Sequence, residues 1–148
     1  MERTDINWCL KDWPKEMKSN FQLCILRKYR KGSYGKGSDS LIKQAALAYG
    51  IPREALVDEK VCRSSNGKPF FKNLGIHFSI SHTDDLWACL IGTANCGLDV
   101  QYIRPCNFTK IAGRFFSERE KAYVQKNGKE GFFEIWTRRE ACGKYTGE

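Results

Sequence analysis

The sequence predicts an α+β fold, and three features of the chain indicate it. A helix-like segment covers residues 38–50, a strand pair follows at 76–92, and helix-like segments occupy 107–147. The 148 residues are 41% hydrophobic and 13% aromatic, which suits one globular domain or two small lobes. The sequence shows no repeat of solenoid period. We therefore expect helices packed against a small sheet.

Five segments have the character of strands or short buried segments. Two precede the first helix, at residues 5–13 and 21–26. The alternating run IHFSISH (76–82) and the apolar run LWACLIG (86–92) predict a hairpin whose second strand is well buried. The fifth, CGLDV (96–100), follows a turn and predicts one more short strand.

The helix at 38–50 has recognisable ends. Ser38 or Asp39 can cap its N-terminus, and Gly50 can close its C-terminus before a proline. The apolar side chains expected on one face are Leu41, Ala45 and Ala48.

The C-terminal segments predict helices separated by a kink. In 107–128 the kink falls near FFS, and Ser117 followed by Glu120 matches a capping box. The last helix covers 130–147 and contains Gly143, which costs about 1 kcal/mol relative to alanine. The aromatic residues of this part are expected in the core; they are Phe115, Phe116, Phe132, Phe133 and Trp136.

The net charge and the cysteines indicate which kinds of partner and which cellular compartment suit the protein. The formal net charge of +8 favours an anionic partner, whether nucleic acid, an acidic protein or a phosphorylated small molecule. No zinc-type cysteine spacing or helix-turn-helix signature supports nucleic-acid binding. Seven scattered cysteines and the lack of a signal-like or membrane-spanning apolar run predict free thiols in a cytoplasmic protein that binds neither membrane nor nucleic acid.

A basic, glycine-rich stretch at residues 27–40 allows two interpretations. It is either a solvated linker or a loop that contacts phosphate groups. Its cationic side chains are Arg27, Lys28, Arg30, Lys31 and Lys36.

Five short motifs occur in a fixed order along the chain. They are NGKP (66–69), SISHT (79–83), GLDV (97–100), FFSERE (115–120) and WTRREACGK (136–144). Each is weak by itself. Together they resemble the 4′-phosphopantetheinyl transferases, in particular the large pseudo-dimeric (Sfp-like) branch. The resemblance covers the chain from about residue 66 onward and implies the fold of that family.

The resemblance implies a magnesium site. Asp99 and Glu140 match the family's metal ligands, and Gln101 stands where the family usually has Glu. From the residues alone, Asp99 is equally a turn or cap residue, and Glu140 can pair with Lys144 at i,i+4 for about 0.3–0.5 kcal/mol. An amide at position 101 brings no charge, so we expect weaker metal binding.

The resemblance also assigns contacts with coenzyme A. Lys144 is implied near the diphosphate, Ser81 and His82 at the phosphates, and Lys68 with Pro69 at the nucleotide end. Lys31 and Lys36 belong to the candidate phosphate loop. Glu120 matches the acid that helps to deprotonate the incoming serine; its alternative is the capping box alone.

The implied activity is Mg²⁺-dependent transfer of phosphopantetheine from coenzyme A to a serine of an acidic acyl or peptidyl carrier protein. The alternative is a shortened relative that binds coenzyme A without transfer. We expect an N-terminal α/β lobe at 1–95 and an incomplete second lobe at 96–148, because the family's strands after the last helix have no counterpart here. Uncovered aromatic side chains then predict a monomer prone to self-association or a dimer.

Overall fold

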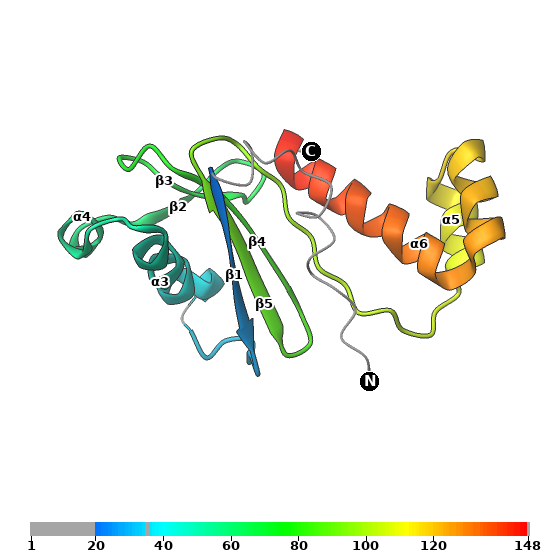
Figure 1. Ribbon diagram of the computed structural model, residues 1–148, viewed down its shortest axis with the longest axis horizontal. Helices are drawn as coiled ribbons and strands as arrows, with labels where there is room; N and C mark the ends of the chain where they lie inside the picture. The colour runs from blue at the N-terminus through cyan, green and yellow to red at the C-terminus, as the bar shows by residue number, and fades with distance from the viewer. Residues whose placement is uncertain (1–19, 35, 148) are drawn as a thin grey trace.

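The computed structural model describes residues 20–34 and 36–147, and it confirms the α+β prediction (Figure 1). A three-stranded sheet stands at the centre. The helices α3 and α4 lie on one side of it, and α6 approaches from the other side, with α5 at the far end (Figure 1). The predicted segment at 5–13 lies outside the described residues.

The sheet is antiparallel and has the strand order β1-β5-β4. Its strands are β1 (Phe21–Arg27), β4 (His77–Thr83) and β5 (Leu86–Gly92). The predicted hairpin is confirmed, with Ser81 opposite Ala88 in the register. Asp84 takes the left-handed conformation (φ 45°) in the tight turn.

The middle strand β5 is buried along its whole length because both of its faces are covered. The side chains of Trp87, Cys89 and Ile91 join the core on the α3 side. Those of Leu86, Ala88 and Leu90 join a second core with residues of the 96–102 segment. Two covered faces explain why LWACLIG is continuously apolar and does not alternate.

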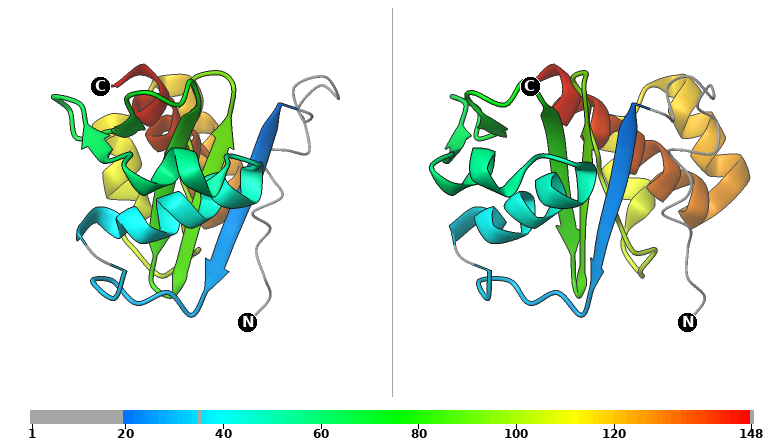
Figure 2. Two further views of the ribbon diagram at one scale, coloured as in Figure 1. Left: turned by 90° about the vertical axis from the view of Figure 1, so that its left-hand side faces the viewer. Right: turned by 60° about the vertical axis from the view of Figure 1, so that its left-hand side comes forward.

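Helix α3 (Asp39–Tyr49) lies across one face of the sheet (Figure 2). It follows the short η1 (Lys36–Ser38), and Gly50 closes it with φ 115°. The buried face consists of Leu41, Ile42, Ala45 and Ala46. The prediction for Ala48 is wrong: this side chain is exposed, because the contact stripe follows i, i+1, i+4 and i+5.

A small second sheet pairs β2 (Val61–Arg63) with β3 (Pro69–Phe71), after the short helix α4 (Arg53–Val57). The turn after β3 is anchored by Glu59, whose carboxylate is buried. One oxygen accepts the backbone N–H groups of Lys72 (2.9 Å) and Asn73 (3.1 Å), and the other accepts the Asn73 side chain (3.0 Å). These hydrogen bonds lower the pKa of Glu59.

The segment 93–107 runs along the sheet towards α5 without regular secondary structure (Figure 1). The strand predicted at 96–100 is therefore wrong. The segment is nevertheless tightly held, since Leu98 and Val100 are buried against β5. Serine side chains of β4 accept the backbone N–H groups of Leu98 and Val100, as described below.

The C-terminal part forms a third core between α5 (Phe108–Phe115) and α6 (Glu118–Thr146). The predicted capping box of Ser117 and Glu120 is present in full. Gly128 (φ 63°, ψ −146°) breaks α6 into two arms, so that the predicted division between 107–128 and 130–147 is confirmed.

Four of the five aromatic side chains expected in this core pack there. Phe116, Phe132 and Phe133 are buried, and Trp136 is half-buried against them. Phe115 differs from the prediction, because half of it (50%) is exposed beside the Arg114 guanidinium.

The cysteines of residues 20–34 and 36–147 agree with the prediction of free thiols. The six cysteines in these ranges are free thiols, and Cys9 lies outside them. Within the same ranges, no helix combines the length and the apolarity that crossing a bilayer requires.

Candidate functional site

A cavity of about 430 Å³ opens beside the edge strand β4. Its walls come from η1, the turn between β2 and β3, β4, the 93–107 segment and the last turn of α6. The lining side chains include Arg63, Lys68, Ser81, His82, Asp99 and Lys144. Five of these six were singled out from sequence, and the structure brings them together.

Asp99 is the buried acid of the cavity, with only 5% of its surface exposed. Its Oδ1 accepts hydrogen bonds from Lys144 Nζ at 2.8 Å and from Ser81 Oγ at 3.0 Å, and its Oδ2 accepts one from Gln101 Nε2 at 3.1 Å. A buried carboxylate is costly unless it is paired and hydrogen-bonded. Here one cation and two neutral donors meet that requirement.

Two serines of β4 hold the segment that carries Asp99. Ser79 Oγ accepts the backbone N–H of Leu98 at 3.0 Å, and Ser81 Oγ accepts that of Val100 at 3.2 Å. The alternation in SISHT therefore places two hydroxyls on one face of β4, where they replace the backbone partners of a neighbouring strand. Ser81 thus positions Asp99; its predicted contact with a phosphate stays a prediction.

Gly97 allows this segment to approach α6. A Cβ built on Gly97 would collide with the carbonyl oxygen of Ala141 and lie 2.7 Å from the backbone nitrogen of Tyr145. The glycine of GLDV is therefore required for the close contact between the segment and the last turns of α6. That contact brings Lys144 within reach of Asp99.

The other two predicted metal ligands, Gln101 and Glu140, differ from Asp99 in their position relative to the cavity. Gln101 is next to Asp99 and presents its amide nitrogen to the carboxylate. Glu140 stands one turn before Lys144 on α6, is exposed, and is not among the residues that line the cavity. Among the described residues, no three His, Cys, Asp or Glu side chains form a metal-type cluster.

These oxygen donors nevertheless suit magnesium chemically. Mg²⁺ is commonly bound by one or two carboxylates with water and phosphate oxygens, and Asp99 supplies one such carboxylate in the cavity, while Glu140 lies on α6 outside the cavity wall. The Lys144 ammonium already donates a hydrogen bond to Asp99 Oδ1. A metal ion can therefore bind this oxygen only after the lysine has moved away.

Lys68 and Pro69 lie in the cavity wall, at the β2–β3 turn and the start of β3. Lys68 Nζ donates to Asn95 Oδ1 at 2.8 Å and to the Cys96 carbonyl at 2.9 Å. Burial lowers the pKa of Lys68, and the nearby Cys96 opposes this shift. In this structure Lys68 holds the start of the 93–107 segment, which carries Asp99, through these two hydrogen bonds.

His82 stands at the cavity with its ring 5.4 Å from that of Tyr29. Burial lowers the pKa of His82, and the positive charges of Lys31 and Lys144 lower it further. A lowered pKa favours the neutral imidazole, which can donate one ring N–H.

The basic stretch reaches the same region. Tyr29 is buried and anchors it, because its backbone N–H donates to the Asp85 carbonyl at 2.8 Å. Lys31 is exposed and acts electrostatically on His82. Lys36 lies in η1 beside Gly37, which lines the cavity; the side chain of Lys36 is outside the described part.

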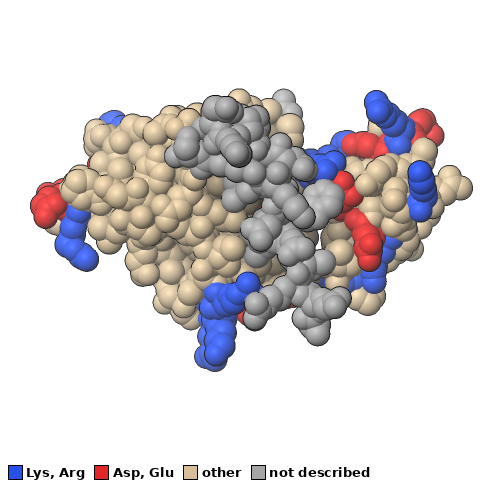
Figure 3. Space-filling view, viewed as in Figure 1, with Lys and Arg blue, Asp and Glu red and all other residues tan. Residues whose placement is uncertain are grey.

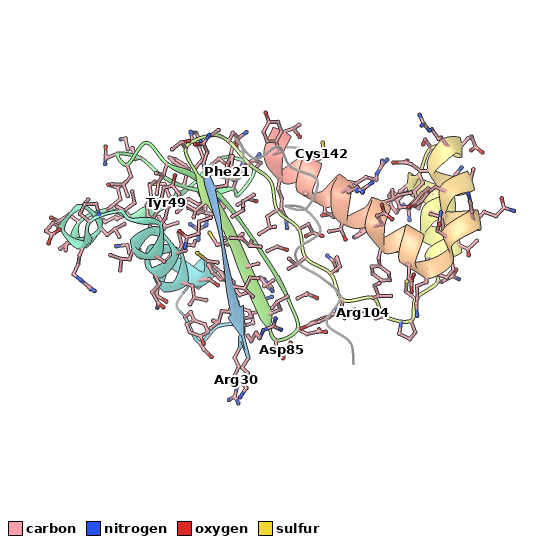
Figure 4. The ribbon with its side chains drawn as sticks, viewed as in Figure 1. Phe21, Arg30, Tyr49, Asp85, Arg104 and Cys142 are labelled. Carbon is pink, nitrogen blue, oxygen red and sulfur yellow. The ribbon has the colours of Figure 1, made fainter. Side chains whose placement is uncertain are left out.

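Basic side chains gather at the lower end of the sheet, basic and acidic side chains are mixed over the α5–α6 region, and the visible surface over α3 is largely uncharged (Figure 3). Arg30 projects away from the body at that lower end, near Asp85, while Cys142 lies at the opposite end on α6 (Figure 4).

Glu120 lies outside the cavity wall. One of its oxygens accepts the Ser117 backbone N–H at 2.7 Å, and both oxygens lie 2.9 Å from Arg139 Nη1. The pKa of Glu120 is lowered, first by the hydrogen bond from the Ser117 backbone and then by Arg139. The alternative interpretation, a capping-box residue, is confirmed; the role as a base stays a prediction.

Three polar residues have contacts at the site that the sequence did not predict, although Asn66 belongs to the NGKP motif. Arg63 lines the cavity and pairs with Asp39 at 2.6 Å. Asn66 and Asn95 donate to the carbonyls of Gly147 and Tyr145 (2.9 Å for Tyr145) and so attach the end of α6 to the β2–β3 turn and to the 93–107 segment. Their only sequence signal is polarity beside a turn, which does not distinguish them from ordinary turn residues.

Comparison with known proteins was decisive for the family. The sequence model described as "4′-phosphopantetheinyl transferase superfamily" matches residues 95–148. The 4′-phosphopantetheinyl transferase AcpT of Salmonella typhi is 31% identical over 142 residues, with 83% of this chain and 73% of the relative covered. The chain belongs to the 4′-phosphopantetheinyl transferase superfamily.

Two further members of this superfamily are similar over shorter parts. The transferase gsp of Aneurinibacillus migulanus is 35% identical over 102 residues, and psf-1 of Bacillus pumilus is 32% identical over 113. These matches cover 66% and 68% of this chain but only 41% and 43% of the relatives. The chain thus spans about two fifths of the length of those two relatives.

Proposed function

We propose that this chain takes part in the transfer of 4′-phosphopantetheine from coenzyme A to a serine of an apo carrier protein. The observation that carries this proposal is the cavity in which Asp99, paired with Lys144 at 2.8 Å, stands beside Lys68 and His82. Cationic and N–H donor groups around a buried acid suit a diphosphate ligand. Three relatives named 4′-phosphopantetheinyl transferases support the same chemistry.

In the proposed reaction the serine hydroxyl oxygen attacks the β-phosphorus of coenzyme A. The bond from that phosphorus to the bridging oxygen breaks, 3′,5′-ADP leaves, and the serine proton passes to a base. Magnesium, when bound at Asp99 and Glu140 with Gln101 beside them, would neutralise diphosphate charge. Lys144 and His82 would bind phosphate oxygens, and Lys68 would lie at the nucleotide end.

The net charge of +8 supports the proposed partner. Carrier proteins of this kind are acidic, so a basic surface would steer them towards the site and raise the association rate. A cytoplasmic location suits such a partner and remains part of the proposal.

The test is an incubation of the purified chain with an apo carrier protein, coenzyme A and Mg²⁺, followed by intact-mass measurement of the carrier. We expect the mass of one phosphopantetheine to be added. An Asp99→Asn variant should lose this transfer. An unchanged carrier mass with several acidic carriers, from a folded sample, would refute the proposal of transfer.

A second candidate function is binding of coenzyme A without transfer. It is favoured by the placement of the two glutamates, since Glu120 and Glu140 both lie outside the cavity wall and Glu120 is engaged by Arg139. Calorimetry separates the two functions: coenzyme A binding without any carrier modification would support the second.

A further inference from the structure

The contact between Lys144 and Asp99 gives this site its own cation. The Asp99 side chain is 4% exposed and that of Lys144 is 33% exposed, so solvent reaches the lysine side chain while the carboxylate is buried. On the basis of the proposed function, we infer that Lys144 is a displaceable counter-ion: it holds Asp99 in the free protein and moves to the diphosphate when magnesium and coenzyme A bind together.

The side chains around Asp99 make such an exchange feasible. Ser81 and Gln101 stay as neutral donors on the two carboxylate oxygens, so only one of three hydrogen bonds must be given up. Lys144 and Gly143 both line the cavity, and the four-carbon stem of lysine can turn its ammonium without movement of the helix backbone.

Charge balance predicts which ligand must come with the metal. In the free protein Asp99 and Lys144 neutralise each other. A magnesium ion alone would add two positive charges beside the ammonium, which is unfavourable at short range. Magnesium together with a doubly charged diphosphate adds no net charge, and Lys144 gains phosphate oxygens in place of the carboxylate.

The neutral side chain at position 101 fits this arrangement. Gln101 donates to Asp99 Oδ2 at 3.1 Å, so the site holds one buried carboxylate and needs one cation in the free protein. A second carboxylate at this position would leave one negative charge unmatched by Lys144.

A displaceable counter-ion competes with Mg²⁺ for Asp99, whereas an ion pair with a purely structural role does not. Removal of the ammonium in Lys144→Met should increase the affinity of the free protein for Mg²⁺, by roughly tenfold if the competing pair is worth that factor. Lys144→Arg should keep the affinity of the unaltered protein, because the guanidinium still competes. Lys126→Met, on the exposed surface of α6, controls for loss of one positive charge.

The experiment is a calorimetric titration of Mg²⁺ into each protein, with and without saturating coenzyme A, corrected for Mg²⁺ binding to coenzyme A alone. In the unaltered protein we expect coenzyme A to strengthen Mg²⁺ binding at least about tenfold. In Lys144→Met this coupling should shrink, since the free protein already binds the metal. Unchanged Mg²⁺ affinity in Lys144→Met would overturn the exchange.

Thermal unfolding provides a second readout. Lys144→Met leaves Asp99 without a cation, so its melting temperature should fall and then recover with added Mg²⁺ more than that of the unaltered protein. If this variant does not fold, Lys144→Gln keeps a hydrogen-bond donor and serves in its place. A tighter Mg²⁺ site in either variant with no coenzyme A binding would uphold the competition and refute the proposed function.

Discussion

At the scale of single residues, the site depends on how one buried carboxylate is satisfied. Asp99 accepts hydrogen bonds from a lysine, a serine and a glutamine that lie on three different segments. The sequence singled out each of these donors, in or directly after a short motif. It did not show that all three bind the same carboxylate. The motifs identify chemistry, while the shared acceptor depends on the fold of the 93–107 segment.

Gln101→Glu tests the charge at this acid. The free protein should lose about 1–3 kcal/mol of stability, because a donor to Asp99 is replaced by a second carboxylate. Mg²⁺ should restore the stability, because it is attracted to two carboxylates. Urea unfolding with and without Mg²⁺ measures both effects.

Gln125→Glu adds the same charge at an exposed position of α6 and is the matched control. Equal effects of the two substitutions would mean that the charge acts only through the net charge of the protein.

Gly97→Ala tests the close approach of the 93–107 segment to α6. The new Cβ would meet the Ala141 carbonyl, so we expect a loss of about 1–3 kcal/mol and a displaced helix end. Gly113→Ala in α5 is the control, because a Cβ there meets nothing within 4 Å and alanine favours a helix by about 1 kcal/mol. The free energy of unfolding, measured with a chemical denaturant, should thus fall in Gly97→Ala and rise in Gly113→Ala. A change in the same direction in both variants would contradict the steric argument.

At the scale of elements, regular structure was predictable where the local signal was strong. The hairpin follows from alternation, the end of the helix at 39–49 from Gly50, and the capping box of α6 from Ser117 and Glu120. The predicted N-cap of the helix at 39–49 is not confirmed, because Ser38 makes no side-chain hydrogen bond to the helix and pairs with the Tyr29 hydroxyl. The strand expected at 96–100 failed for a physical reason: its amides bind the serine hydroxyls of β4, and such bonds leave no ladder. Hydropathy shows burial but not which partner satisfies the backbone.

The capping box gives a prediction for α6. Ser117→Ala should cost about 1 kcal/mol, because the backbone N–H of Glu120 loses its acceptor at the helix start. Ser117→Asp keeps an acceptor and should restore most of the stability. Circular dichroism melting curves of the two variants test this; equal melting temperatures would show that the cap contributes nothing.

At the scale of the whole molecule, residues 20–34 and 36–147 form three cores. Two of them lie on opposite faces of β5, and the third joins α5 to α6. The sequence indicated the apolar material of all three. It did not indicate the contacts of Arg63, Asn66 and Asn95, because their partners lie far away in the chain and no periodicity marks them. The expected self-association and the lobe boundary at residue 95 stay predictions.

Acid stability provides a test of the whole fold. Folding lowers the pKa of Glu59 from its ordinary value of 4.5, so its carboxylate stabilises the fold above that value. The contribution is lost as the pH falls through the lowered pKa of the folded state. Glu59→Gln should therefore be less stable near neutral pH and show a weaker dependence below about pH 4.5. Unfolding curves from pH 3 to 7 that run parallel for both proteins would contradict this.

The attachment of the α6 end to the β2–β3 turn also bears on the order of folding. Asn66 and Gly147 are 81 positions apart, and Asp99 and Lys144 are 45 apart, whereas the hairpin forms from neighbouring residues. Closing long loops is slow because the chain loses entropy before it gains contacts. We therefore expect the cavity to assemble last and to open first, so that its amides exchange with deuterium faster than those of β5 and become protected when a ligand joins the two ends.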